Sequence, residues 1–409
     1  MQDKKIGASR IEALDFLRGA ALMLIILFHS SIYNFANIHK IDFSDPPIII
    51  VLMSFMALWG GVFIIYSMVV NAIMALRRSE EGGFNREIFS NMALSGGALL
   101  IFHYILNIFL GRWNIDFINN RPDLTVLAGS LREMTFVFPH IGKFFEGSSL
   151  STIGLNLIIL SGVMLLMMRG NGIKKQKRNY FILWLAGFSI MALSFVRVAI
   201  FPVMAKSIAA GDYLTATFFG FFIANPYPLL PYLAYGIFGL MIGMMMHGGR
   251  RDLLKKIIIP SGIAFAVFGL VGMMNFDKTI SKPDFFWYFK TNFELGLFLL
   301  LTAAMYFLAG PGQYVFKKLA FVRWFSRVSL SVYMLEVLLS EILRIVLFRF
   351  SPAWNQTING CLAFGAFNIL VWIAILFVWQ RFDFKYSLEY YWVIMSAKIG
   401  KRSTKLDSL

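Results

Sequence analysis

Two side chains near the start of the chain, Arg18 and His29, combine residue types and a spacing that can support chemistry. They lie eleven residues apart in an apolar segment, so on a helix they are about 16 Å and three turns apart and project from nearly the same face. Asp15 precedes Arg18 by three residues and can pair with it. A neutral imidazole can take a proton from a hydroxyl or amine, or carry a transferred group for one step. The alternative is structural: Arg18 reaches the lipid headgroups and His29 bonds to a neighbouring helix.

Further ionisable side chains fall inside apolar segments, where a charge costs about 2.5–3.5 kcal/mol at mid-depth of a bilayer. These residues are His103, Arg197, Glu294, Glu336, Glu341 and Arg344. Several of them, together with Asn225, are expected at the depth of His29, which suggests a polar cavity open to the outside. The substrate-binding candidates are His103, Arg197 and Asn225 from this set, together with Glu336. For Glu341 and Arg344, three residues apart, a structural ion pair is favoured.

The elements that must hold these residues are membrane-spanning helices. The 409 residues are 58% hydrophobic and 15% charged, and the mean hydropathy is +0.69. The apolar residues form blocks of about 20, the length that crosses a bilayer. We therefore predict an all-α, polytopic membrane protein with ten spans, at about 13–34, 49–76, 91–111, 151–168, 180–201, 225–246, 257–275, 291–310, 326–348 and 360–380.

The distribution of basic residues predicts the topology. With the N-terminus in the cytoplasm, 25 of the 38 Lys and Arg residues lie in inside segments and 10 in outside segments. This bias favours cytoplasmic N- and C-termini and an even number of spans. It also explains the net charge of +16 without a nucleic-acid partner, because the basic residues lie between spans and not on one compact domain.

The segments outside the spans divide the chain into two parts. Residues 1–382 are predicted to form one transmembrane domain, and residues 383–409 a cytoplasmic interfacial helix with a basic tail. Residues 112–150 form the longest outside loop, and the apolar segment 214–224 is too short to span. Asn355, Gln356 and Thr357 form a glycosylation sequon on the predicted outer side. The single cysteine, Cys361, excludes an internal disulfide.

One stretch resembles a known family. RIEALDFLRGAALMLIILFH, residues 10–29, is similar to the opening of the membrane acyltransferase superfamily, which includes the bacterial saccharide O-acyltransferases and looks related to the heparan glucosaminide N-acetyltransferases. The O-acyltransferase motif is a basic residue, ten residues and a histidine, here Arg18 and His29; Asp15 and Gly19 also match. Residues 225–243 and 326–339 resemble later spans of the two branches. Where many O-acyltransferases have histidine in the last of these spans, this chain has Glu336.

The resemblance implies transfer of an acyl group, most often acetyl, from cytoplasmic acyl-CoA to a saccharide or other envelope acceptor on the outer side. It implies that His29 is catalytic, as a base or as an acylated intermediate. It also implies that Arg18, with Asp15 and Arg327, contacts the CoA donor. No metal is expected. The expected partners are the bilayer, acyl-CoA and the acceptor, the expected location is the cell (inner) membrane, and a homodimer is left open.

Two other function classes compete with the enzyme. A secondary transporter or flippase of a polar solute would also use buried charges and helices broken near Pro226, Pro228 and Pro231. A binding or sensing protein with a degenerate site is kept open by Glu336. No glycine-rich phosphate loop and no zinc-protease motif occur in the sequence, so nothing in it favours an ATP-driven pump or a metalloprotease.

Overall fold

The structure, a computed structural model, describes residues 12–41, 47–57, 59–81, 85–111, 114–116, 121–169, 175–223, 226–276, 284–308 and 319–399. The described chain is almost entirely helical and divides into two compact units. Within the described residues, the first unit consists of 61–103 and 144–308 and the second of 12–60, 104–143 and 319–399. Each unit is therefore built from segments that are far apart in the sequence.

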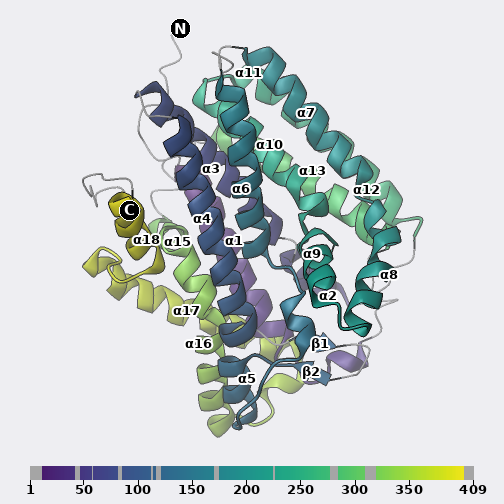
Figure 1. The fold of residues 1–409 in the computed structure, drawn as a ribbon. Coiled ribbons are helices and arrows are strands. Elements are labelled where there is room, and N and C mark those ends of the chain that lie inside the picture. The colour runs from purple at the N-terminus through teal and green to yellow at the C-terminus, as the bar shows by residue number, and fades with distance from the viewer. Residues whose placement is uncertain are drawn as a thin grey trace. The chain divides into compact units, whose positions relative to one another are not determined.

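The second unit contains the first and the last helices of the chain (Figure 1). Its α-helices are α1 Glu12–Ile32, α2 Ile48–Ala57, α5 Val126–Glu133, α15 Ala320–Arg327, α16 Ser329–Phe350, α17 Ile358–Trp379 and α18 Leu388–Ile399. Short helical turns occur at Ile38–Lys40, Leu106–Leu110, Trp354–Gln356 and Gln380–Phe382, and another at Ile141–Phe144 where the chain passes into the first unit. The exception to the all-helical prediction is a small antiparallel hairpin, β1 Asn114–Asp116 and β2 Arg121–Asp123, in which Asn114 pairs with Asp123.

Helix α1 is packed against α15, α16 and α17. Two glycines allow the closest approaches. A Cβ added to Gly19 would lie on the carbonyl oxygen of Val322 in α15, and one added to Gly365 in α17 would meet Ser31 and Leu27 of α1. Small residues at such positions let helix backbones come close in a membrane. These two close approaches hold α1 at Gly19, the residue after Arg18, and near its C-terminal end at Ser31, two residues after His29.

The first unit contains the middle of the chain. Its α-helices are α3 Gly60–Glu80, α4 Asn85–Ile105, α6 Ser149–Met168, α7 Gln176–Leu193, α8 Val196–Ala209, α9 Tyr213–Ile223, α10 Leu229–His247, α11 Arg251–Leu253, α12 Ile259–Met273 and α13 Phe285–Leu308, with a π-helical segment at Leu254–Ile258. Helix α10 is buried along nearly its whole length. Its Gly236, Gly239 and Gly243 pack against α6 and α3, as their spacing predicts.

Eight described helices are long and apolar enough to cross a membrane, and the bent pair α7 and α8 forms a ninth if it is one span. These are the features of a multi-pass membrane protein. Three predicted spans differ in detail. Span 326–348 corresponds to α16, which begins at Ser329 and is not among the eight helices. Span 49–76 is divided into α2 and α3, with Gly60 and Gly61 at the junction. Span 180–201 bends by 58° between α7 and α8, where the hydroxyl of Ser194 bonds back to the carbonyl of Met191.

Candidate functional site

Helix α1 carries both principal candidates, Arg18 and His29, in the second unit. Both side chains are partly buried, and the His29 side chain is 10% exposed. Acidic residues, Glu12 and Asp15, occupy the first turn, where the helix dipole favours negative charge. The single helix predicted for this segment is present, with Arg18 and His29 on it eleven residues apart.

Ser326 of α15 connects the two polar residues at the start of α1. Arg18 donates a hydrogen bond from Nη2 to the backbone carbonyl of Ser326. The Ser326 hydroxyl, at Oγ, donates to Asp15 Oδ1 over 3.1 Å. Arg323, one turn earlier on α15, forms an ion pair with Glu12 at 3.1 Å. Asp15 and Arg18, which the sequence predicted as partners, are thus both held on α15. Arg327, the third residue predicted to contact the CoA donor, is exposed at the end of the same helix.

Glu389 of α18 caps the beginning of α16 from outside that helix. Its carboxylate accepts hydrogen bonds from the backbone N–H of Leu330 at 2.6 Å and from the hydroxyl of Ser331 at 2.6 Å, with a longer bond from the N–H of Ser331. Burial raises the pKa of Glu389, while these hydrogen bonds and the positive charge of Arg18 oppose that shift. Sequence reasoning missed Glu389, because a cap supplied by another helix leaves no local motif.

His29 meets a carboxylate from α16. Its Nδ1 lies 2.5 Å from Oε1 of Glu336, whose side chain is 2% exposed. The second carboxylate oxygen, Oε2, is buried and has no hydrogen-bond partner among the described residues. A carboxylate on Nδ1 fixes the tautomer of an imidazole and leaves Nε2 as the basic nitrogen. The sequence singled out both residues but proposed Glu336 as a substrate contact and did not pair them.

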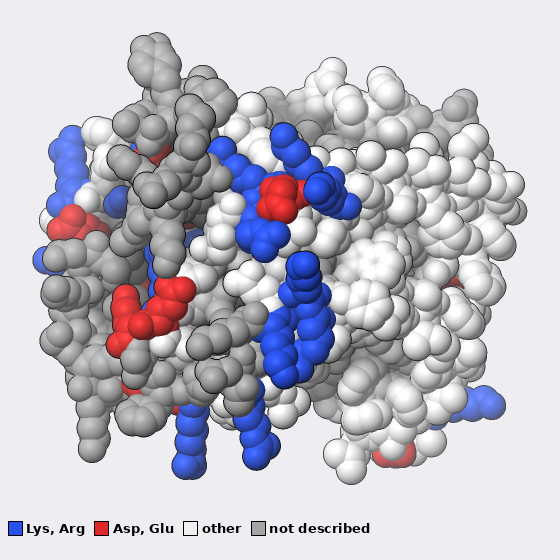
Figure 2. All heavy atoms as spheres, turned by 90° about the horizontal axis from the view of Figure 1, so that it is seen from above, with Lys and Arg blue, Asp and Glu red and all other residues white. Residues whose placement is uncertain are grey.

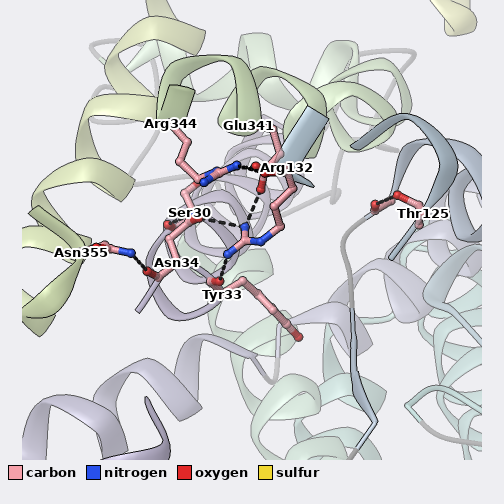
Figure 3. Close-up of polar contacts among 9 residues, drawn as sticks. Ser30, Tyr33, Asn34, Thr125, Arg132, Glu341, Arg344 and Asn355 are labelled. Carbon is pink, nitrogen blue, oxygen red and sulfur yellow. Dashed lines mark hydrogen bonds and ion pairs between the residues drawn. The ribbon is translucent and has the colours of Figure 1, made fainter. Parts of the chain in front are cut away.

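A second polar cluster lies just past the end of α1 and further along α16 (Figure 3). Arg132 of α5 donates to Oε1 of Glu341 at 2.8 Å, to the side-chain oxygen of Asn34 and to the carbonyl of Tyr33. Arg344 donates to the other oxygen of Glu341 at 2.5 Å and to the carbonyl of Arg132. The predicted Glu341–Arg344 pair is confirmed. Burial lowers the pKa of Arg132, and the charge of Glu341 opposes that shift.

Arg132 links the long loop to the end of α1. The ring of Tyr33, whose carbonyl Arg132 contacts, lies 5.9 Å from the ring of His29 in an edge-on arrangement. The cluster also includes Asn355 of the predicted sequon, which donates through its side chain to the carbonyl of Asn34. No local motif marks Arg132, because its partners lie about 100 and 210 residues away in the sequence.

The remaining candidates belong to the first unit. His103 is fully buried, and its Nδ1 lies 2.7 Å from the hydroxyl of Ser148. Arg197 is 1% exposed, and it donates twice to the carbonyl of Ile223 with its guanidinium 3.6 Å from the centre of the Trp287 ring. Asn225 lies outside the described residues. The predicted convergence of these residues with His29 stays a prediction, because they lie in the other unit.

Glu294 is the centre of another polar group in the first unit. It is 2% exposed, with the ammonium of Lys290 at 3.3 Å and the hydroxyl of Tyr232 donating over 3.3 Å. Tyr235 lies beside Tyr232 and donates to the carbonyl of Thr291. The hydrogen bonds of the two tyrosines hold α10 against α13, whereas the Lys290–Glu294 pair lies within α13.

No protein-family model matches the sequence, and no curated protein matches it.

Proposed function

We propose that this chain is a membrane-bound acyltransferase that moves an acyl group, most often acetyl, from acyl-CoA to a saccharide or other envelope acceptor. The observation that carries the proposal is the contact between His29, on the helix that also bears Arg18, and the buried carboxylate of Glu336 on α16. The resemblance of residues 10–29 to the opening of the membrane acyltransferases supports the same conclusion.

The pair suits proton transfer to and from an attacking group. With its Nδ1 proton held by Glu336, His29 can accept at Nε2 the proton of an acceptor hydroxyl or amine as that group attacks the thioester carbonyl. The new C–O or C–N bond forms, the C–S bond breaks, and the proton passes to the departing CoA sulfur. The Glu336 carboxylate stabilises the imidazolium that forms in between. The same imidazole can instead attack first and carry the acyl group to the acceptor.

In the proposal, Arg18 binds the donor with Asp15 and Arg327. A guanidinium suits phosphate groups, because its planar N–H groups match phosphate oxygens. Arg18 lies eleven residues before His29 on α1, which corresponds to about 16 Å along a helix. This separation fits a donor whose phosphates and thioester lie at opposite ends of a long arm.

The proposal includes ten spans, cytoplasmic termini and location in the cell (inner) membrane. The charge bias of the sequence supports this topology. Figure 2 views the face that carries α11, and basic side chains outnumber acidic ones among its described residues. Helix α16 corresponds to the ninth of the ten spans in this proposal, and three of its charged residues, Glu336, Glu341 and Arg344, pair with an ionisable side chain.

The test uses the purified protein in detergent with CoA, acetyl-CoA and a set of saccharide acceptors. We expect acetyl-CoA to raise the melting temperature. His29→Ala should keep this stabilisation and lose acyl transfer, whereas Arg18→Ala should weaken it. His140→Ala, which removes an exposed histidine of the long loop, is the matched control and should change neither. A protein that shows no stabilisation at millimolar CoA, or a His29→Ala variant that retains transfer, contradicts the proposal.

A transporter or flippase of a polar solute is the second candidate, and the first unit supplies the observation that favours it. There the bent pair α7 and α8, the short apolar helix α9 and the buried charges Arg197 and Glu294 occur in one unit. Discontinuous helices and buried charges are typical of transporter binding sites. Solute uptake into proteoliposomes without acyl-CoA, abolished by Glu294→Gln, would favour this candidate over the enzyme.

A further inference from the structure

The second unit has an apolar groove on a side of α15 that does not face α1. The groove is lined by Phe321 and Trp324 of α15 and by Leu370, Ile373, Ala374 and Phe377 of α17, and its volume is about 390 Å³. Volumes of this size are within the range of ligand pockets. The lining contains no charged side chain, so the groove suits a hydrocarbon chain.

One wall of the groove belongs to a helix that is apolar enough to span a membrane, and the other to a short amphipathic helix. Helix α17 is part of a segment that is long and apolar enough to cross a membrane, and its Leu370 is 63% exposed. Helix α15 is amphipathic, because Val322, Phe325 and Ser326 are buried while Arg327 is exposed. In a membrane, an exposed apolar surface of this kind is covered by lipid chains.

A cation lies at one end of the groove. Arg381 follows the lining residue Phe377 by four positions, and its guanidinium lies 4.8 Å from the centre of the Phe377 ring. Its side chain is exposed. Trp324, from the other wall, also contacts the Phe377 ring, with 6.1 Å between ring centres. Phe377 therefore connects the apolar groove to a guanidinium that is accessible to an anionic group.

We propose that this groove binds an anionic phospholipid, with one acyl chain between α15 and α17 and the phosphate on Arg381. The guanidinium of Arg381 suits the phosphate of the lipid, with which it forms charge-assisted hydrogen bonds. An anionic lipid is favoured over a zwitterionic one because its headgroup has no ammonium group to repel the arginine. The inference is independent of acyl transfer. A bound lipid would also support α15, the helix on which Arg18 is held.

The test compares phosphatidylglycerol with phosphatidylcholine of the same acyl chains, added to delipidated protein in detergent. We expect phosphatidylglycerol to give the larger rise in melting temperature and to be retained preferentially in native mass spectrometry. Arg381→Gln should lower the apparent affinity for phosphatidylglycerol about tenfold, the effect of losing about 1.4 kcal/mol. Arg349→Gln, which removes an exposed cation at the end of α16, is the matched control and should leave the preference intact.

The groove itself is tested by filling it. Ala374→Leu should weaken binding of both lipids, whereas Ala366→Leu, at an exposed position on the same helix outside the groove, should not. A photo-crosslinking residue placed at Ile373 should capture more phosphatidylglycerol than the same residue placed at the exposed Phe367. This measurement tests the groove even if Ala374→Leu does not fold. Equal stabilisation by the two lipids, an unchanged preference in Arg381→Gln, or equal crosslinking at both sites would overturn the proposal. If palmitoyl-CoA is the only added molecule that displaces the bound lipid, the groove is a site for the acyl chain of the CoA donor. That result would also overturn the proposal.

Discussion

At the residue scale, Glu336 changes the chemistry expected of His29. An isolated imidazole in an apolar helix bundle favours its neutral form, because burial opposes charge. A carboxylate 2.5 Å from Nδ1 instead supports the imidazolium that forms when Nε2 takes a proton. In the proposed reaction, Glu336 therefore acts through His29 and not by contact with the substrate.

Glu336→Gln tests this role. The amide keeps the size of the side chain but removes the negative charge and can present a donor to Nδ1, which favours the wrong tautomer. We expect the rate of acyl transfer to fall about 10²–10⁴-fold while acetyl-CoA still stabilises the protein. The measurement is the initial rate across pH, with the melting temperature recorded for each preparation.

The matched control for that experiment is Glu133→Gln, an exposed acidic residue at the end of α5. Glu336→Asp should recover part of the rate, because it restores the charge. A full rate in Glu336→Gln, with wild-type pH dependence, would show that the carboxylate has only a packing role.

The spacing of Arg18 and His29 could be predicted from sequence, because both lie on one helix of regular pitch. The pairing of His29 with Glu336 could not, because 307 residues separate them and nothing in either segment specifies the rotation of α16 about its axis. The partners of Arg132 were missed for the same reason. Local periodicity determines which residues share a face, whereas the packing of helices determines what that face meets.

At the element scale, α18 and α16 are connected through a single carboxylate. Glu389 accepts hydrogen bonds from the backbone N–H groups of Leu330 and Ser331. These groups lie in the first turn of α16 and have no partner within that helix. The Ser331 hydroxyl adds a further bond to Glu389 and accepts one from the N–H of Leu388. Residues 383–409, predicted to contain an interfacial helix, include the helix α18, and Glu389 attaches it to α16.

The attachment of α18 should depend on pH. Burial raises the pKa of Glu389 in the folded protein above its unfolded value, so the folded state binds the proton more tightly. The stability that this shift contributes is fully present at pH values below the pKa of Glu389 in the unfolded chain. It is lost as the pH rises through the pKa of Glu389 in the folded protein. We expect hydrogen exchange in residues 388–399 to be slower at pH 5 than at pH 8, after correction for the intrinsic rate. Glu389→Gln should remove most of this difference in exchange rate. Faster corrected exchange at pH 5 than at pH 8 would contradict the prediction.

The helices as a set could largely be predicted from apolar blocks of membrane-spanning length. Their interruptions could not, because hydropathy does not report backbone geometry. Gly60 and Gly61 are compatible with an apolar span, and yet α2 ends before them and α3 begins there. Ser194 is equally inconspicuous in an apolar segment, although its hydroxyl bonds to the preceding turn at the 58° bend.

At the scale of the whole molecule, helix α16 decides the topology. It has 22 residues, enough to cross a bilayer, but it carries three charges near its middle and is not among the eight apolar helices. Those charges are not isolated: Glu336 meets His29, and Glu341 lies between Arg132 and Arg344. Pairing lowers the free energy of inserting these charges into the bilayer, because each charge partly cancels the electric field of the other in the hydrocarbon. We therefore expect α16 to span.

Reporter fusions test this prediction. A fusion after Lys318, which precedes α15 and α16, should lie in the cytoplasm, and a fusion after Ala353 should lie on the other side. Alkaline phosphatase should accordingly be inactive at Lys318 and active at Ala353, and a green fluorescent protein should show the reverse pattern. A fusion after Leu409 should be cytoplasmic again, because α17 returns the chain across the bilayer. The same reporter activity at Lys318 and Ala353 would mean that α16 does not cross, which would leave an odd number of spans and place the two termini on opposite sides.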